Sequence, residues 1–224
     1  MELPINTRII NTKKTLNLLL IFVSKINILT DFYIFFRTGL EHIADFSGYD
    51  HILFLLALCG GYGFHQWRVL LVLVTGFTVG HSLTLALSVW DIFSFPTVLV
   101  EWLIALTIFI TCLYNLRYAN ENRLFPNLYH YLASIGFGLV HGMGFSTLLK
   151  SMLGKTQDLL IPLFAFNLGI EAGQLIILAA VLFISVLLPI IFGISKRSWN
   201  QYVSAAVSGI ALMLVLERFG ELLS

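Results

Sequence analysis

Acidic residues and histidines stand directly before and inside the start of an apolar run at residues 52–58. They are Glu41, His42, Asp45, Asp50 and His51. A charged side chain near the hydrocarbon of a membrane costs roughly 2.5–3.5 kcal/mol even on translocon insertion scales. A metal ion, a partner charge or a watery cavity must therefore offset that cost. Imidazole and carboxylate groups together are ligands typical of zinc, nickel, iron or copper(II).

More polar residues lie inside other apolar stretches, at similar expected depths. They are His81, Glu101, His141, Asn167, Glu171 and Gln174. His81 and His141 each lie about 13 residues from the expected inner ends of their helices, or roughly 20 Å at 1.5 Å per residue. Counting in the same way, we expect Glu101, Asn167 and Glu171 in the same half of a ~30 Å hydrocarbon core. This convergence predicts one intramembrane site shared by several helices.

The glycines beside these residues indicate how the helices meet. Gly76 and Gly80, Gly138 and Gly142, and Gly169 and Gly173 are pairs of small residues four positions apart. Such pairs let helix backbones approach closely inside a membrane. The sequence therefore predicts a tight bundle with histidines and carboxylates in its interior.

A metal site is the prediction that accounts for most of these residues at once. The expected ligands are His51, His81, His141, Asp50, Glu101, Glu171 and His42, with Asn167 and Gln174 as outer supports. Three simpler alternatives remain open. Asp50 and His51 could be a first-turn pair favoured by the helix dipole. Glu101 could pair with a cation, although no Lys or Arg is expected at its depth. Glu171 and Gln174 could join neighbouring helices through hydrogen bonds.

The composition predicts an all-α, polytopic membrane protein. Of the 224 residues, 58% are hydrophobic and 11% are charged, against about 25% charged in soluble domains. The net charge of +1, without a basic block, gives no support for a nucleic-acid partner. We expect a bundle of six to seven helices over residues 32–224, because several segments approach the ~20 apolar residues that a bilayer requires. Those segments are 48–64, 68–90, 97–117, 128–150, 158–192 and 199–219.

Residues 1–31 resemble a signal peptide or the start of an uncleaved first span. If a span covers residues 16–41, the counts of Lys and Arg in the loops place the N-terminus in the cytoplasm. The C-terminus is then outside, and the polar site lies in the outer half of the bilayer. A bacterial inner (plasma) membrane is the expected location.

Five ordered blocks of sequence resemble one known family. They are G-x-x-H-I-x5-G-x-D-H-I-L-F-L-L, F-T-x-G-H-S-L-T-L, V-E-x-x-I-A-L-x-I, F-G-L-V-H-G-x-G-F and F-N-x-G-x-E-x-G-Q. Together they cover about residues 32–220 and are similar to the HupE/UreJ membrane proteins, in particular the broader branch of that family. The first block lacks the proline-containing histidine segment of the nickel-associated branch. The family is associated with hydrogenase and urease accessory loci, so the resemblance implies transport of a divalent transition metal.

Three functions fit these observations. The first is a permease for a divalent metal, nickel or zinc, that is captured from the outer side. The second is an intramembrane zinc hydrolase acting on a lipid or lipid-linked substrate, with Asp50 or Glu101 as general base and Ser82 helping to hold an oxyanion. The third is an accessory protein with a structural metal. The expected partners are the lipid bilayer and the metal ion, and the oligomeric state stays open.

Overall fold

The structure, a computed structural model, describes residues 5–45, 48–62, 64–93, 95–118, 128–153 and 159–224, with the backbone alone for residues 5–22, 24, 129 and 147. The described residues form helices and no strand, so the all-α prediction is confirmed. The elements are α1 (Ile5–Ala44), α2 (Asp50–Gly61), the short 3-10 helix η1 (Phe64–Gln66), α3 (Trp67–Val89), α4 (Thr97–Arg117), α5 (Leu128–Leu153), α6 (Leu160–Phe192) and α7 (Lys196–Leu223).

Four of the described helices are long and apolar enough to cross a membrane. They are α4, α6, α7 and α3 together with η1. Helix α2 is apolar but has only 12 residues, which is too short to span ~30 Å of hydrocarbon. The expected count of six to seven spanning helices is therefore met only in part. The length of α6 follows from its continuous apolar run, and Gly193 ends it in a left-handed conformation at φ 63°.

Helices α1 and α6 pack in direct backbone contact. A Cβ atom at Gly39 would overlap the carbonyl of Phe166, and one at Gly169 would overlap the carbonyl of Phe36. Only glycine allows this approach, as the small-residue pattern predicts. Gly169 lies beside Phe36, and Gly173, one turn later in α6, lies beside Leu40, one turn later in α1. The two helices therefore run in the same direction.

Helices α3 and α5 form a second close pair of the same kind. A Cβ at Gly138 would overlap the carbonyl of Phe77, and one at Gly142 would overlap the carbonyl of His81. The contact moves from Phe77 to His81 along α3 as it moves from Gly138 to Gly142 along α5. The two helices therefore run in the same direction. Because His81 lies at this crossing, the glycines fix its position relative to His141 on α5.

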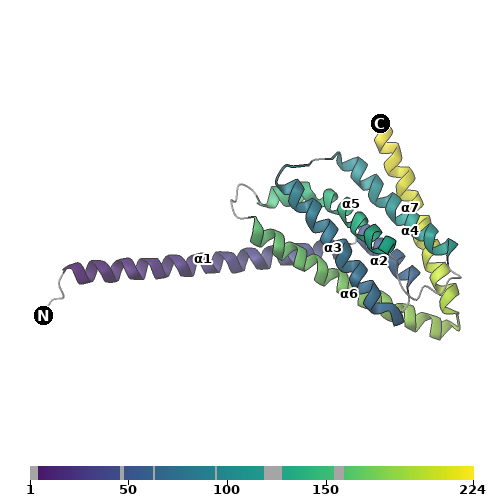
Figure 1. Cartoon of the computed structure of the whole chain (residues 1–224), viewed down its shortest axis with the longest axis horizontal. Coiled ribbons are helices and arrows are strands. Elements are labelled where there is room, and N and C mark those ends of the chain that lie inside the picture. Colours follow the sequence, from purple (N-terminus) through teal and green to yellow (C-terminus); the bar gives the residue numbers. More distant parts are fainter. Residues whose placement is uncertain (1–4, 46–47, 63, 94, 119–127, 154–158) are drawn as a thin grey trace.

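Helices α1 and α2 run in the same direction, although they follow each other in the chain. Gly60, near the end of α2, lies beside Ser204 and Asn200 near the start of α7. Helix α6 also leads to the start of α7, through the short turn at residues 193–195. Both α2 and α6 therefore run toward this end of the bundle, and α1 is parallel to α6. Figure 1 shows the same course, with α1, α2, α4 and α6 all drawn from left to right.

The expected alternation of antiparallel spans therefore fails between the first two helices. Instead, α1 and α2 are consecutive parts of one path through the bundle, interrupted between Ala44 and Asp50. Interrupted helices of this type line the substrate sites of many transporters, because a break exposes helix ends inside the protein. The N-terminal part of α1 projects well beyond the bundle (Figure 1).

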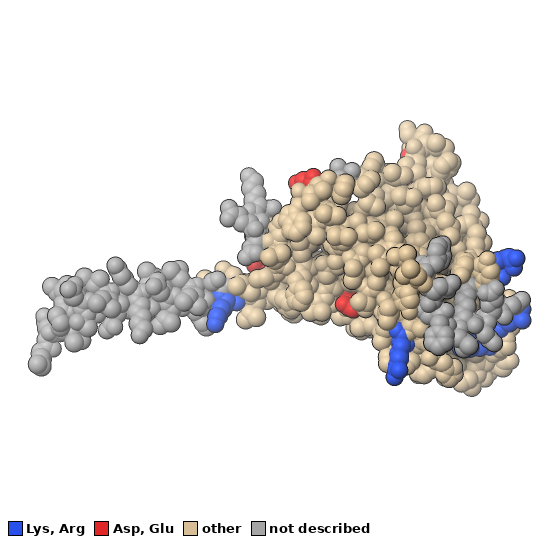
Figure 2. Space-filling model, viewed as in Figure 1, with Lys and Arg blue, Asp and Glu red and all other residues tan. Residues whose placement is uncertain are grey.

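Charged side chains are sparse on the surface of the bundle. Figure 2 shows Lys and Arg mainly at the end away from the projecting part of α1. The helix bounds place Arg68, Arg117, Lys196 and Arg197 at that end, where α3 and α7 begin and α4 finishes. Exposed leucines, isoleucines and phenylalanines cover much of the remaining surface, as expected of helices that face lipid.

Candidate metal centre

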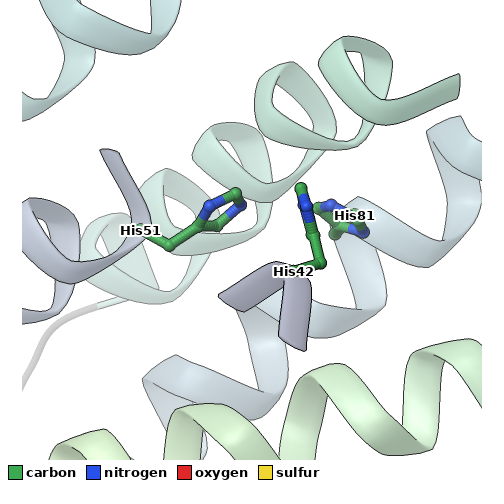
Figure 3. A group of neighbouring side chains, drawn as sticks. All are labelled: His42, His51 and His81. Carbon is green, nitrogen blue, oxygen red and sulfur yellow. The ribbon is translucent and has the colours of Figure 1, made fainter. Parts of the chain in front are cut away.

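Three histidines from three different helices meet inside the bundle. His42 lies in the last turn of α1, His51 in the first turn of α2, and His81 in α3. Each offers a ring nitrogen that is within 4.8 Å of the others, and Figure 3 shows the three rings gathered around one place. Ligand nitrogens around a tetrahedral metal, at about 2.0–2.1 Å from the ion, lie roughly 3.4 Å apart. Small side-chain movements would therefore bring the triad to bonding distance.

Five of the six ring nitrogens of this triad have no hydrogen-bond partner within the described structure. Both ring nitrogens of His51, both of His81, and Nε2 of His42 are buried without a hydrogen bond. His81 is fully buried and His51 is 7% exposed. Leaving a buried polar group unsatisfied typically costs about 1–3 kcal/mol. Imidazole nitrogens are good donors to zinc and nickel, so these residues fit a transition-metal ion, whose bonds would offset that cost.

His141 stands beside the triad in a state suited to metal binding. Its ring centre is 5.4 Å from that of His51. Its Nδ1–H donates to the carbonyl of Phe137 at 2.8 Å, and its Nε2 is buried without a partner. A metal-binding histidine commonly donates its second nitrogen to a carbonyl in this way, which fixes the tautomer. His141 is therefore available as a fourth ligand.

The break between α1 and α2 adds an electrostatic contribution. The C-terminal end of a helix carries unsatisfied carbonyls and a partial negative charge of about half an elementary charge. His42 lies in the last turn of α1, so this end points toward the triad. Aromatic rings close the site: Phe145 lies with its centre 3.9 Å from His42 and stacks on Phe166 at 4.9 Å. The site thus combines a cation-favouring helix end with walls that exclude water.

Asp50 is held outside the triad by an arginine. Arg218 of α7 contacts both carboxylate oxygens of Asp50, at 3.0 and 3.4 Å, and donates to the backbone carbonyl of Glu101 at 2.8 Å. Asp50 and Arg218 are mostly buried, with side chains 15% and 17% exposed. Both border a cavity of about 180 Å³, together with Glu101, Glu217 and Glu221. Because Asp50 precedes His51 directly, this polar cavity lies next to the triad.

The other residues singled out from the sequence lie in different surroundings. Glu171 accepts from Thr75 at 3.0 Å and Gln174 accepts from Thr78 at 2.7 Å, so both connect α6 to α3. The Ser82 hydroxyl donates to the carbonyl of Thr78 in its own helix. The side-chain amide of Asn167 donates to Leu163, and its Oδ1 is buried without a partner. The structure thus gathers the four histidines and spreads the carboxylates around them.

Arg218 is the residue that sequence reasoning missed. Its place near the end of the last apolar segment, 199–219, predicts a basic residue at the outer membrane surface and not a partner for Asp50 or Glu101. The available signal was weak: a single arginine close to the end of an apolar helix. Such a residue is ordinarily one that extends its charge to the interface. Counting depth brings Asp50 and Glu101 to a similar level, but the rotation of α7 that turns Arg218 toward them cannot be inferred from hydropathy.

We expect Arg218→Ala to destabilise the protein much more than Arg37→Ala. Removing one partner of a buried ion pair leaves an uncompensated charge and costs about 3–5 kcal/mol. The exposed pair of Arg37 and Glu41, with side chains 64% and 59% exposed, contributes about 1 kcal/mol or less. Unfolding of the two purified variants in detergent measures the difference. Equal losses of stability in both variants would contradict a structural role for the Arg218–Asp50 pair.

Comparison with known proteins supports the sequence blocks. A family model described as HupE / UreJ protein matches residues 20–219. No curated protein and no solved structure matches the chain. The match and the four apolar helices mark the chain as an integral membrane protein with a histidine cluster. Because the family model extends over most of its length, the chain belongs to the HupE/UreJ family.

Proposed function

We propose that the protein is a permease for a divalent transition metal, nickel or zinc, that binds at the histidine cluster. The observation that carries the proposal is the convergence of His42, His51 and His81 on one place with buried, unpartnered nitrogens. A permanently closed structural site is normally built from four ligands. Here three nitrogens are up to 4.8 Å apart and the fourth histidine stands aside. A site with three protein ligands leaves one position of the ion open, which suits an ion that must bind and leave.

The interrupted α1–α2 path also supports transport. His42 and His51 lie on opposite sides of the break, one at a helix end and one at a helix start. A change in the angle between α1 and α2 would alter the distance between these two ligands. In many transporters the substrate and ion sites are formed by discontinuous helices of this kind near the middle of the membrane. The break therefore gives a physical means of coupling metal binding to movement.

We further propose that the metal arrives from outside the cell. The end bearing Arg68, Arg117, Lys196 and Arg197 would face the cytoplasm by the positive-inside rule. The polar cavity at Asp50 and Glu101 lies toward the other end, near the start of α4. In this orientation α1 begins and α7 finishes on the outer side of a bacterial inner membrane. This proposed orientation keeps the sequence-based expectation for α2 to α7 and for the C-terminus, and reverses it for the N-terminus.

A zinc hydrolase acting on a lipid is the second candidate, because three histidines are also the protein ligands of some catalytic zinc sites. Its expected general bases are less well placed. Asp50 is paired with Arg218, and the hydroxyl of Ser82 donates to its own helix. Glu101 borders the outer cavity beside Arg218. The permease therefore accounts for the geometry with fewer rearrangements.

Uptake into proteoliposomes tests the proposal. We expect the wild-type protein to move nickel or zinc into vesicles faster than empty vesicles do, while the vesicle lipids stay chemically intact. His65→Ala is a matched control, because His65 is exposed in η1 and lies outside the cluster. It should transport like the wild type. Uptake equal to that of empty vesicles, with metal-dependent lipid cleavage in the same preparation, would reject the permease in favour of the hydrolase.

A further inference from the structure

Three phenylalanines lie against the histidine cluster on its inner side. Phe54 of α2 stacks on Phe77 of α3 with ring centres 4.6 Å apart, and Phe137 of α5 meets Phe54 edge-on at 6.1 Å. We call these three residues the aromatic barrier. Phe77 lies 4.9 Å from the ring of His141 and 6.3 Å from that of His51. Phe54 and Phe77 are fully buried, so the barrier seals the inner side of the site.

A cavity of about 90 Å³ lies on the other side of this barrier. Phe54 and Phe137 form part of its wall, together with residues from the inner halves of α2, α3, α4 and α5. Most of the wall is apolar. Six polar residues also border it: Tyr62, Thr111, Tyr114, Asn115, His130 and Ser134. The hydroxyl of Tyr114 lies 3.3 Å from Nε2 of His130, so polar atoms are present beyond the barrier.

The arrangement resembles a hydrophobic gate. An apolar constriction stops ions because water and the hydration shell are lost there. Protein interiors are normally close-packed, so rings rarely have space to move. Here the cavity gives Phe54 and Phe137 adjacent space. Phe137 is also linked to the site directly, because its carbonyl accepts the hydrogen bond from His141. A shift of His141 toward a metal would therefore act on the turn that carries Phe137.

We propose that Phe54, Phe77 and Phe137 form the gate of the metal route, and that the cavity below them receives the divalent cation when it leaves the histidines. This inference rests on the proposed permease function and adds the second half of the path to it. The histidines select the ion, and the aromatic barrier separates them from the inner side. The polar residues around the cavity offer the first contacts after the barrier has opened.

Metal flux through a variant with a smaller side chain in the barrier tests this assignment. We expect Phe54→Ala to bind nickel or zinc with the wild-type stoichiometry but to conduct it into proteoliposomes at least about tenfold faster, because the dewetted constriction is widened. Phe35→Ala is the matched control. Phe35 is also a buried phenylalanine, 8% exposed, but it belongs to the separate hydrophobic cluster formed with α6. Its flux should not exceed that of the wild type.

The outcomes separate the gate from the permease. If the wild type transports and Phe54→Ala binds metal but transports no faster, the gate is wrong and the permease stands. If the wild type transports no metal and Phe54→Ala does, the three rings are a fixed seal that never opens, and both the gate and the permease are overturned. If both bind metal and neither conducts, both proposals are overturned. Phe54→Leu, which keeps an apolar side chain, should give intermediate flux and replaces Phe54→Ala if that variant does not fold.

Discussion

Replacing His81 with leucine should abolish tight metal binding. His81 supplies one of three converging nitrogens, and no other described histidine lies at its place in the triad. Loss of a group that only hydrogen-bonds to a metal ligand typically lowers metal affinity about 10–100-fold. Loss of a ligand itself should therefore lower the affinity by more than about 100-fold. Titration of the purified protein with nickel or zinc, followed by metal analysis after gel filtration, measures the effect. Retention of one metal per chain at wild-type affinity would exclude His81 as a ligand.

The same substitution should leave the metal-free protein at least as stable as the wild type. Both ring nitrogens of His81 are buried without partners, and its side chain is fully buried. A leucine of similar volume removes that cost, which is typically about 1–3 kcal/mol for an unsatisfied buried group. The substitution should therefore lower metal affinity while it raises or preserves stability, a trade-off that is common at functional sites. Unfolding of the metal-free proteins in detergent tests this second expectation.

A lower stability of metal-free His81→Leu would show that the His81 nitrogens have partners in the folded protein. His65→Ala, outside the cluster, serves as the control for loss of a histidine and should change neither property. Adding metal should widen the stability gap between wild type and His81→Leu, since a ligand that binds only the folded state stabilises it by mass action. The two measurements together distinguish a ligand from a residue that only packs.

The sequence predicted an all-helical membrane protein in which histidines from distant segments come together, and the structure gathers His42, His51 and His81. Continuous apolar runs predicted α3, α4, α6 and α7 because a membrane leaves the backbone no other way to satisfy its hydrogen bonds. Depth counted along each helix brought His51, His81 and His141 to one level, since the rise per residue is constant. The glycine pairs beside His81 and His141 added that these two helices meet closely near their histidines.

The course of α1 and the partners of the carboxylates lay beyond that reasoning. Hydropathy does not reveal that a helix stops midway and that the chain continues in the same direction, so α1 and α2 were expected to alternate. Depth along a helix also says nothing about its rotation. Asp50 therefore has the expected level but pairs with Arg218, and Glu171 bonds to Thr75 on the neighbouring helix. Rotation depends on side-chain packing between helices, which only the assembled bundle defines.

Adding one methyl group at Gly138 should separate α3 from α5 and so damage both the fold and the metal centre. The Cβ of an alanine there would overlap the backbone carbonyl of Phe77 and press on the backbone of His81. Backbone atoms cannot move aside as a flexible side chain can, so the helices must shift apart. Overpacking of this kind typically costs about 1–3 kcal/mol, and more where the backbone is rigid. Because His81 moves with α3, metal affinity should fall together with stability.

Gly136→Ala provides the matched control, two residues earlier in the same helix. A Cβ at Gly136 meets nothing within 4 Å, and alanine is favoured over glycine inside a helix by up to about 1 kcal/mol. This variant should be as stable as the wild type or slightly more stable, with unchanged metal binding. The two alanines have the same chemistry and nearly the same position along α5, so a difference between them isolates the α3–α5 contact. If Gly138→Ala behaves like Gly136→Ala in detergent unfolding and metal titration, the two helices do not meet through their backbones, and the position of His81 relative to His141 must be set by other contacts.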